Sequence, residues 1–453
     1  MFASHRYPRL AAAIASLLFA CGVPTLTDAA GELEQYVARP DSSYSWREVG
    51  SGKVDTAQYV ELILTSQTWQ GIPWKHQLFV FRPDNLDTST RQALLYIDGG
   101  RWHPEFEAGL PRLPKEARIF ARLAAAMRGP LAVVRQVPFQ PMFDRREDAL
   151  IAYTFDRYLT TGQSEWPLLL PMVKSAARAM DTVQQVVWER WKIPVDRFTV
   201  SGASKRGWTS WLTAAIDARV AAAAPMVIDM LNIPAQIDLQ RSVFGSLSDE
   251  VRDYEDIDLP GRIDTELGQR LLEMVDPYRY RTRLTQQKLI LLGTNDRYWP
   301  LEALKVYWGG LPEPKRVLYV PNQGHKLADY ERVLGTLSAL HRYSAHGKSL
   351  PRVEWAFTNG SDTLELHVQP DQQPRSVIAW SATSPTRDFR ESRWSAQPCA
   401  PAQDGFVCRQ SLTGDRHTAL YSEIVFTDEG APDFSLSTGV CVAGGPEPHD
   451  EKC

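Results

Sequence analysis

Residues 198–211 read FTVSGASKRGWTSW, and this stretch decides the fold. Its first part, residues 198–201, is apolar and β-branched, as is typical of a buried parallel strand. After Gly202 the apolar residues take a helical spacing. We therefore place Ser204 at a sharp strand-to-helix turn. A serine held there projects its hydroxyl above the sheet, and the next backbone N–H points toward a developing oxyanion.

The hexamer around Ser204 allows two interpretations. It reads GASKRG over residues 202–207, so its second glycine is displaced by one position from the usual Gly-x-Ser-x-Gly elbow. Ser204 is either a nucleophile or a residue that caps the helix after a glycine-rich turn. Ser201 is a rival nucleophile, but it falls inside the strand, where its hydroxyl would be buried. The choice between a nucleophile and a helix cap therefore depends on whether an acid and a histidine suited to a serine nucleophile follow further along the chain.

An acid and a histidine follow in the order nucleophile, acid, histidine, each at the end of a predicted strand. Residues 288–293 (KLILLG) lead to Asp296, and residues 316–320 (RVLYV) lead to His325. We expect His325 to take the Ser204 proton and Asp296 to fix the imidazole tautomer and stabilise its charged form.

Three other residues compete for these two roles. Asp229 also follows a predicted strand and is the rival acid, although acids more often follow the later strand of this fold. Among the histidines, His103 lies in a glycine loop and His341 lies in the middle of a predicted helix. Asp296 and His325 are therefore the predicted partners of Ser204.

The predicted strand over residues 93–98 ends in the sequence GGRW. A glycine pair there allows close approach of backbone N–H groups to a substrate oxygen. The alternative is an ordinary glycine turn. With Ser204 as the nucleophile, we expect the oxyanion to be held by the N–H of Lys205 and by one from Gly100 or Arg101. Trp102 and Trp299 are the predicted substrate-binding residues.

The alternation of strands and helices predicts an α/β class and an α/β-hydrolase fold, with a mostly parallel, doubly wound sheet. We expect the α/β-hydrolase domain over residues 31–347, with a charged helical cap at about residues 236–285. Residues 351–453 change to short alternating runs separated by turns, which predicts a C-terminal all-β, sandwich-like module.

Apart from Cys21, the cysteines are confined to this module: Cys399, Cys408, Cys441 and Cys453. An even set in one terminal region of an exported protein predicts disulfides, with three possible connectivities. We favour the pairing of neighbours, Cys399 with Cys408 and Cys441 with Cys453. A structural zinc site is the lesser interpretation because no Cys-x-x-Cys occurs, and we expect no metal and no cofactor.

The N-terminus predicts export. Basic residues precede the alanine- and leucine-rich run 10–20, so residues 1–30 are interpreted as a signal peptide. Cleavage after residues 27–29 (TDA) is favoured over a lipoprotein box with a lipid anchor at Cys21, and the sequence leaves both open. The net charge of −4 gives no reason to expect nucleic acid or an anionic membrane as a partner. No later window is long and apolar enough for a transmembrane helix.

Eight segments together resemble the PhoPQ-activated pathogenicity-related proteins: residues 147–154 (EDALIAYT), 178–184 (RAMDTVQ), 200–208 (VSGASKRGW), 227–232 (VIDMLN), 276–278 (DPY), 293–296 (GTND), 320–325 (VPNQGH) and 388–390 (DFR). The resemblance implies an exported α/β-hydrolase-like protein, linked in bacteria to virulence and to resistance against antimicrobial peptides. It implies no substrate. The elbow is also similar to that of glucuronoyl esterases, which points to a carbohydrate ester as one possible substrate class.

Two hypotheses follow for the function. The first is a secreted or periplasmic serine hydrolase that cleaves an ester, an amide or a peptide through an acyl-enzyme. The second is a non-catalytic exported protein that keeps the fold and acts by binding or signalling. A pure binder has no chemical reason to hold serine, acid and histidine in this order, so the sequence favours the hydrolase.

Overall fold

A computed structural model describes residues 31–108 and 113–445 of the chain. The predicted signal peptide, Cys21 and Cys453 lie outside these residues. In the described part, no helix has the length and apolar character needed to cross a bilayer.

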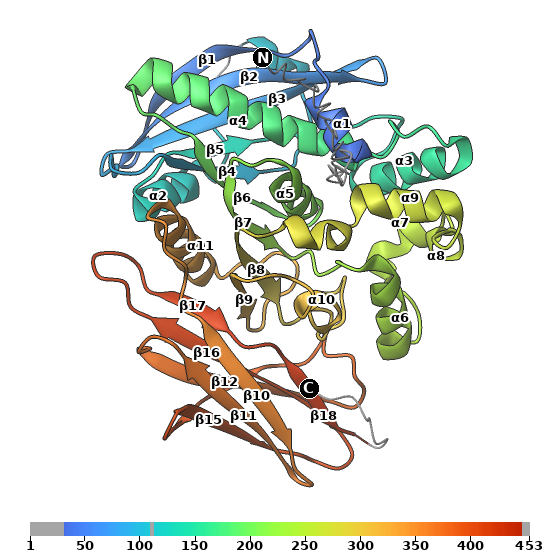
Figure 1. Cartoon of the computed structure of the whole chain (residues 1–453), viewed down its shortest axis with the longest axis vertical. Coiled ribbons are helices and arrows are strands. Elements are labelled where there is room, and N and C mark those ends of the chain that lie inside the picture. Colours follow the sequence, from blue (N-terminus) through green and yellow to red (C-terminus); the bar gives the residue numbers. More distant parts are fainter. Residues whose placement is uncertain (1–30, 109–112, 446–453) are drawn as a thin grey trace, which may run out of the picture.

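One large sheet forms the centre of the molecule (Figure 1). Its spatial order is β1-β2-β3-β5-β4-β6-β7-β8-β9 before it continues into the C-terminal region. The pairs from β1 to β5 in this order are antiparallel, and those from β5 to β9 are parallel. The strands are β1 (Ser45–Val54), β2 (Ala57–Trp69), β3 (Ile72–Pro83), β4 (Gln92–Ile97), β5 (Leu131–Val134), β6 (Arg197–Ala203), β7 (Val220–Met226), β8 (Gln287–Gly293) and β9 (Lys315–Val320).

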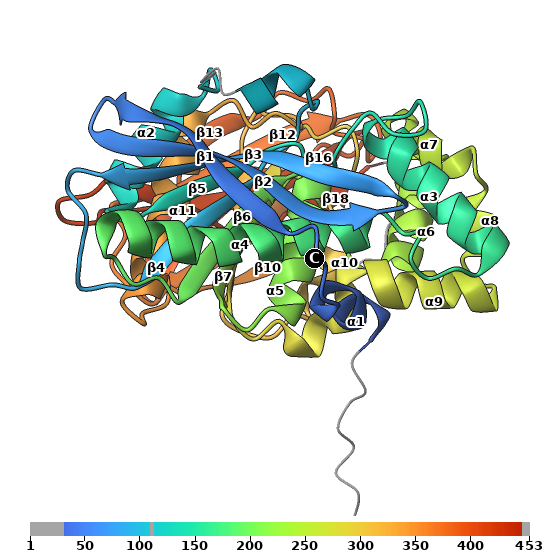
Figure 2. The ribbon, with the colours of Figure 1, turned by 90° about the horizontal axis from the view of Figure 1, so that it is seen from above.

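Helices cover both faces of this sheet, as the view from above shows (Figure 2). Alternate residues of β4 belong to two separate apolar clusters: Leu95 and Ile97 pack with α4 and α5, whereas Leu94 packs with α2 and α11. The parallel strands are apolar on both sides for this reason. The helices that cover the sheet or lie beside it are α1 (Glu32–Ala38), η1 (Pro104–Ala108), α2 (Ala117–Met127), α3 (Glu147–Thr161), α4 (Leu169–Trp191), α5 (Lys205–Ile216), α10 (Lys305–Trp308) and α11 (Tyr330–Ala345).

The segment between β7 and β8 is helical and contains no strand, as its charged sequence predicts. It packs against α3, where Tyr254 donates a hydrogen bond to Asp148 at 3.0 Å and Arg262 pairs with Asp156 at 2.7 Å. We refer to it as the cap. Its elements are α6 (Ile233–Phe244), η2 (Asp249–Val251), α7 (Arg252–Glu255), α8 (Leu259–Arg262), α9 (Glu266–Val275) and η3 (Pro277–Arg283).

The C-terminal module contains two antiparallel sheets. Strands β10, β11, β15 and β14 form one sheet, and β17, β16, β12, β13 and β18 form the other. Cys399 and Cys408, one of the two predicted pairs, are joined by a disulfide. The strands are β10 (Val353–Asn359), β11 (Thr363–Pro370), β12 (Ser376–Ser384), β13 (Ser395–Pro398), β14 (Ala400–Ala402), β15 (Gly405–Ser411), β16 (His417–Phe426), β17 (Phe434–Ser437) and β18 (Cys441–Gly444).

The module is not a separate body beside the main sheet. Ser437 in β17 pairs with Val317 in β9, so one module sheet continues the main sheet edge to edge. The Ser437 hydroxyl also accepts a hydrogen bond from the Tyr319 N–H at 3.0 Å. This pairing covers the edge of β9, which would otherwise expose unpaired backbone groups. The α/β-hydrolase fold is confirmed, but the sequence did not predict this continuous sheet.

Candidate active site

Ser204 lies at the predicted elbow between β6 and α5, with φ 57° and ψ −129°. A positive φ is strained for a residue with a side chain and costs about 1–3 kcal/mol. Two backbone hydrogen bonds hold it there: the Ser204 N–H donates to Met226 O at 2.8 Å, and the Trp208 N–H donates to Ser204 O at 2.9 Å. A Cβ on Gly202 would lie 2.8 Å from the carbonyl oxygens of Ile97 and Arg206. The glycine therefore allows α5 to recross the sheet closely.

His325 and Asp296 are paired. Nδ1 of His325 lies 2.9 Å and 3.1 Å from the two carboxylate oxygens of Asp296. Asp296 is buried, and its Oδ1 also accepts the Tyr298 N–H at 3.0 Å. The ring of Tyr298 stacks on the imidazole with centroids 4.1 Å apart. Nε2 of His325 is buried and has no hydrogen-bond partner among the described residues. This nitrogen is therefore the one available to exchange a proton with a substrate or a nucleophile.

The rival acid and the rival serine have other partners. Asp229 accepts a hydrogen bond from the Tyr307 hydroxyl at 2.6 Å. Burial raises the pKa of Asp229 to about 7, opposed by this hydrogen bond and assisted by the charge of Asp296. The Ser201 hydroxyl is buried and donates to Ala224 O at 2.7 Å. Neither arrangement leaves the group free for proton transfer.

The rival histidines are equally unsuited. His341 is buried in α11, where its Nδ1 lies 3.0 Å from the Thr199 hydroxyl. Burial lowers the pKa of His341 to about 3. His103 is exposed and lies beside η1, where its ring contacts Phe106. Of the three candidate histidines, His325 alone pairs with a carboxylate that follows a parallel strand of the main sheet.

Ser204, His325, Gly99 and Gly100 line one cavity of about 450 Å³. The N–H of Lys205 belongs to the first turn of α5, where N–H groups have no carbonyl of the same helix to bind. Gly100 has φ 114°, and its carbonyl accepts a hydrogen bond from Gln140 Nε2 at 3.1 Å. A Cβ on Gly99 would collide with the Arg206 guanidinium. The glycine turn therefore fits tightly against the elbow helix.

The two predicted tryptophans lie outside the lining of this cavity. The ring of Trp102 packs against Phe106 and Phe139 at 5.5 Å and 6.0 Å. Trp299 lines a separate cavity of about 80 Å³ beneath the cap. The Arg101 side chain is exposed, and the cavity is lined by Gly99 and Gly100 instead. The prediction for both tryptophans rests on their sequence position beside the glycine turn or the loop of Asp296, and this position does not determine where a ring packs.

Sequence reasoning missed a group of charges behind the elbow. Glu147, at the start of α3, accepts two hydrogen bonds from Arg206 at 2.7 Å and 2.8 Å and pairs with Lys205 at 3.0 Å. Lys205 also pairs with Asp148 at 2.8 Å. Burial opposes ionisation of Glu147, but the hydrogen bonds and charge of Arg206 hold its pKa well below the usual range. The only signal in the sequence is that the dipeptide Glu147-Asp148 is acidic and the distant dipeptide Lys205-Arg206 is basic.

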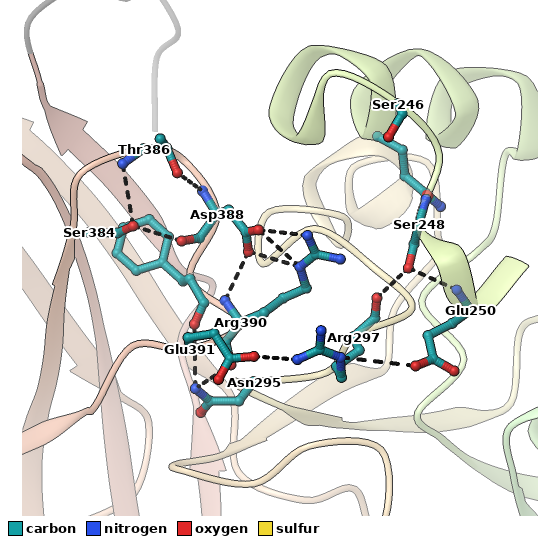
Figure 3. A network of polar contacts seen from close by, with 12 residues as sticks. Ser246, Ser248, Glu250, Asn295, Arg297, Ser384, Thr386, Asp388, Arg390 and Glu391 are labelled. Carbon is teal, nitrogen blue, oxygen red and sulfur yellow. Dashed lines mark hydrogen bonds and ion pairs between the residues drawn. The ribbon is translucent and has the colours of Figure 1, made fainter.

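Sequence reasoning also missed the contacts that hold the acid and histidine loops. Asn295 precedes Asp296, and its Nδ2 donates to the carbonyl oxygens of Phe389, Arg390 and Ser392 at 3.4, 3.2 and 2.7 Å. Figure 3 shows this amide against the module loop, beside Arg297, which contacts Glu391 and Glu250.

The histidine loop is held in the same way. Asn322 lies between the end of β9 and His325. Its Nδ2 donates a hydrogen bond to Trp394 O at 3.1 Å. Its Oδ1 accepts the Trp394 N–H at 2.8 Å. Two amides thus fix the loops of Asp296 and His325 to one segment of the C-terminal module, residues 389–394.

No cluster of three or more histidine, cysteine, aspartate or glutamate side chains suited to a metal ion occurs among the described residues.

Comparison with known proteins gives a family and several structural likenesses. The sequence model of the PhoPQ-activated pathogenicity-related proteins matches residues 33–390. Autocrine proliferation repressor protein A of Dictyostelium discoideum is 29% identical over 389 residues, which is 79% of this chain and 76% of that protein.

Among solved structures, an acetyl xylan esterase from Paenibacillus sp. has a TM-score of 0.47 and 14% identity, and covers 69% of this chain and 91% of that one. Acetyl xylan esterase 1 from Thermoanaerobacterium sp. has a TM-score of 0.44 and 16% identity, and covers 65% of this chain and 87% of that one.

Proposed function

The chain belongs to the family of PhoPQ-activated pathogenicity-related proteins, and we propose that it is an exported serine hydrolase that cleaves an ester or an amide. One observation carries the proposal. A strained serine at a strand–helix elbow and a histidine paired with a buried aspartate line the same cavity. Strain of this kind persists only where the surrounding structure holds it, and it gathers at functional sites.

The reaction has two halves. In the first, Nε2 of His325 takes the proton of Ser204 as Oγ bonds to the substrate carbonyl carbon. The carbonyl oxygen becomes an oxyanion, bound by the N–H of Lys205 and by an N–H of the Gly100–Arg101 turn, each donor lowering the barrier by about 3 kcal/mol. The bond to the leaving group then breaks, and His325 returns the proton to that group.

In the second half, water attacks the acyl-enzyme and His325 takes its proton. A second oxyanion forms and collapses, the bond to Ser204 breaks, and the proton returns to Oγ. Asp296 stabilises the imidazolium in both halves because it accepts the Nδ1 hydrogen bond.

The first test is covalent labelling. The purified mature protein is incubated with a fluorophosphonate and weighed intact, beside Ser204→Ala, His325→Ala and the matched control Ser201→Ala. We expect one label on the wild type and on Ser201→Ala, and none on the other two. A wild type that is folded by circular dichroism and takes no label would contradict the proposal.

Export is supported by the disulfide between Cys399 and Cys408 and by the predicted signal peptide. The mass of the mature protein recovered from a bacterial periplasm or medium tests it. The mass of a chain that starts after residue 29 or 30 supports export by simple cleavage. The mass of a chain that starts at a lipid-modified Cys21 supports anchoring. An uncleaved chain recovered from the cytoplasm contradicts both.

A second candidate function is secreted signalling by binding. The observation in its favour is the name of the Dictyostelium relative, which describes that protein as an autocrine repressor of proliferation. Labelling separates the two candidates, because a binder does not need a serine that reacts with a fluorophosphonate. If the label is absent, a pull-down with the folded wild type and with Ser204→Ala is expected to recover the same partner.

A further inference from the structure

The cavity that holds Ser204 continues between two helices. Its lining runs from the catalytic side chains to α2 and α11, which contact one another on one face of the sheet (Figure 1). Its volume of about 450 Å³ lies within the range of small-molecule sites in proteins. Tyr96 of β4 also lines it and packs on Phe120 of α2 with ring centroids 5.6 Å apart. The space is therefore an extension of the catalytic pocket that reaches the helix layer.

One wall of this extension is apolar. Its side chains come from α2, from α11 and the loop before it, and from the end of β7, and each is at most 7% exposed. They are Phe120, Leu123, Met226, Leu327, Val333 and Leu337. All six belong to the apolar cluster that packs α2 and α11 on the sheet. This wall offers contacts to carbon and no hydrogen bonds.

Two ion pairs belong to the lining of the cavity. Arg135 donates to Asp98 at 3.1 Å, and Arg206 holds Glu147 at 2.7 Å. Each of these two pairs is neutral as a whole. Glu116 and the exposed Lys326 also line the cavity. The cavity therefore combines paired charges near Ser204 with the apolar wall between α2 and α11, and we call the space along this wall the apolar arm.

We propose that the substrate of Ser204 is an ester or amide carrying an aliphatic chain, and that this chain lies between α2 and α11. The inference rests on the proposed hydrolase function. A chain that enters this arm covers buried apolar surface, and each methylene placed there raises affinity for the transition state. A short acyl group such as acetate leaves the apolar wall uncovered.

A second apolar cavity provides the control. It lies under the cap, has about 80 Å³, and is lined by Ile237, Leu247 and Trp299 among others. Ser204 and His325 are not part of its lining. A bulky substitution there changes the cap without touching the arm between α2 and α11.

The experiment measures kcat/KM against chain length in two series. One series is p-nitrophenyl esters from acetate to laurate, and the other is acetate esters of alcohols from methanol to dodecanol. We expect kcat/KM to rise about fourfold for each added methylene in one series until the arm is full. The series that responds tells whether the chain belongs to the acyl group or to the leaving group, and either result supports the proposal.

Two variants locate the chain. Val333→Phe fills the arm, so we expect it to lower kcat/KM at least tenfold more for the longest good substrate than for the shortest ester of the same series. Ile237→Phe is expected to follow the wild-type series. If Val333→Phe is not folded, Leu334→Phe, a half-buried residue of the same cavity, replaces it.

Three results would overturn the proposal while the hydrolase function stands. The first is a kcat/KM that stays constant or falls with chain length in both series. The second is an equal loss of kcat/KM for short and long chains in Val333→Phe. The third is a change of chain-length preference in Ile237→Phe instead of Val333→Phe. In each case the fluorophosphonate still labels Ser204. Loss of that label in the folded wild type is a different result, because it contradicts the proposed function itself.

Discussion

The two sides of the candidate site are supported by different parts of the chain. Ser204 is held by the β6–α5 turn, whose backbone hydrogen bonds involve Met226 and Trp208, and Glu147 pairs with Arg206 and Lys205 behind this turn. Asp296 and His325 lie on loops that are bound by module residues about 72–97 positions further along the sequence. The nucleophile side is therefore complete within the α/β domain, whereas the acid–histidine side depends on the C-terminal module.

We infer from this difference that the module positions the loops of Asp296 and His325. Asn295 and Asn322 place the two triad loops against the same segment, so a shift of that segment moves Asp296 and His325 together. Backbone packing between the loops is close as well, since a Cβ on Gly324 would lie 3.2 Å from Asn295 O. Small displacements at such a site have large kinetic consequences.

The largest effect is expected from the acid itself. Asp296→Asn keeps the shape but removes the charge that stabilises the imidazolium, so we expect kcat to fall about 10⁴-fold. Asp229→Asn is the matched control, because Asp229 contacts Tyr307 and not His325. We expect less than a tenfold loss from it, measured on the best ester substrate. Equal losses would show that the two acids share the role.

The module contacts come next in size. Asn295→Ala and Asn322→Ala are each expected to lower kcat about 10- to 100-fold, because the paired loops lose their fixed position. Steady-state kinetics on the best ester substrate measures the loss, and circular dichroism shows whether each variant is folded.

The matched control for these variants is Asp428→Asn. Asp428 pairs with Arg342 of α11 at 2.5 Å, a contact between module and α/β domain that does not involve the triad loops. We expect its kcat to stay within twofold of the wild type. If Asp428→Asn is as slow as the asparagine variants, the module stabilises the fold in general and does not position the triad.

The sequence predicted the nucleophile side better than the acid–histidine side, for a physical reason. The Ser204 elbow depends on neighbours in sequence, so the strand, the turn glycine and the helix spacing are readable locally. The loops of Asp296 and His325 could be placed by strand order. Their supports could not be predicted, because an asparagine that binds backbone carbonyls about 94–97 residues away carries no pattern.

The same reason explains which strands of the fold could not be predicted. The edge strand β1 and the short strands β13, β14, β17 and β18 have too few apolar residues or too little length to stand out. The pairing of Ser437 with Val317, which makes the sheet continuous, is a tertiary contact that no local signal announces. The triad residues themselves stay predictions until labelling tests them.

Asp229 gives a test of burial on the acid–histidine side. Its pKa is raised from 3.8 to about 7 in the folded protein. Between these values the native state holds a proton that the unfolded chain has released, so stability falls as pH rises, by at most about 1.4 kcal/mol per pH unit, and levels off above pH 7.

In Asp229→Asn the side chain is neutral at every pH, so the free energy of unfolding does not fall with rising pH on account of this residue. We therefore expect the variant to match the wild type in free energy of unfolding near pH 4 and to exceed it at pH 8, by up to a few kcal/mol. Urea titrations across that range measure the difference. A difference in free energy of unfolding that stays the same from pH 4 to pH 8 would mean that the pKa of Asp229 is not raised in the folded protein.

The smallest effect is expected on the nucleophile side, from Glu147→Gln. The change removes the charge that pairs with Lys205 and Arg206, both of which are buried, while the Glu147 side chain is 40% exposed. Solvent screening at Glu147 reduces the cost, and we expect a loss of about 1 kcal/mol at pH 7.

The pH dependence identifies the cause of this loss. The folded pKa of Glu147 is lowered, so its contribution is present above the ordinary glutamate pKa of 4.5 and is lost as pH falls below it. Wild type and variant are therefore expected to converge in free energy of unfolding toward low pH. Because the Ser204 turn is held by its own backbone hydrogen bonds, fluorophosphonate labelling of the variant should proceed within a few-fold of the wild-type rate. A loss of labelling as large as that of Asn295→Ala would show that the nucleophile side, too, depends on distant support.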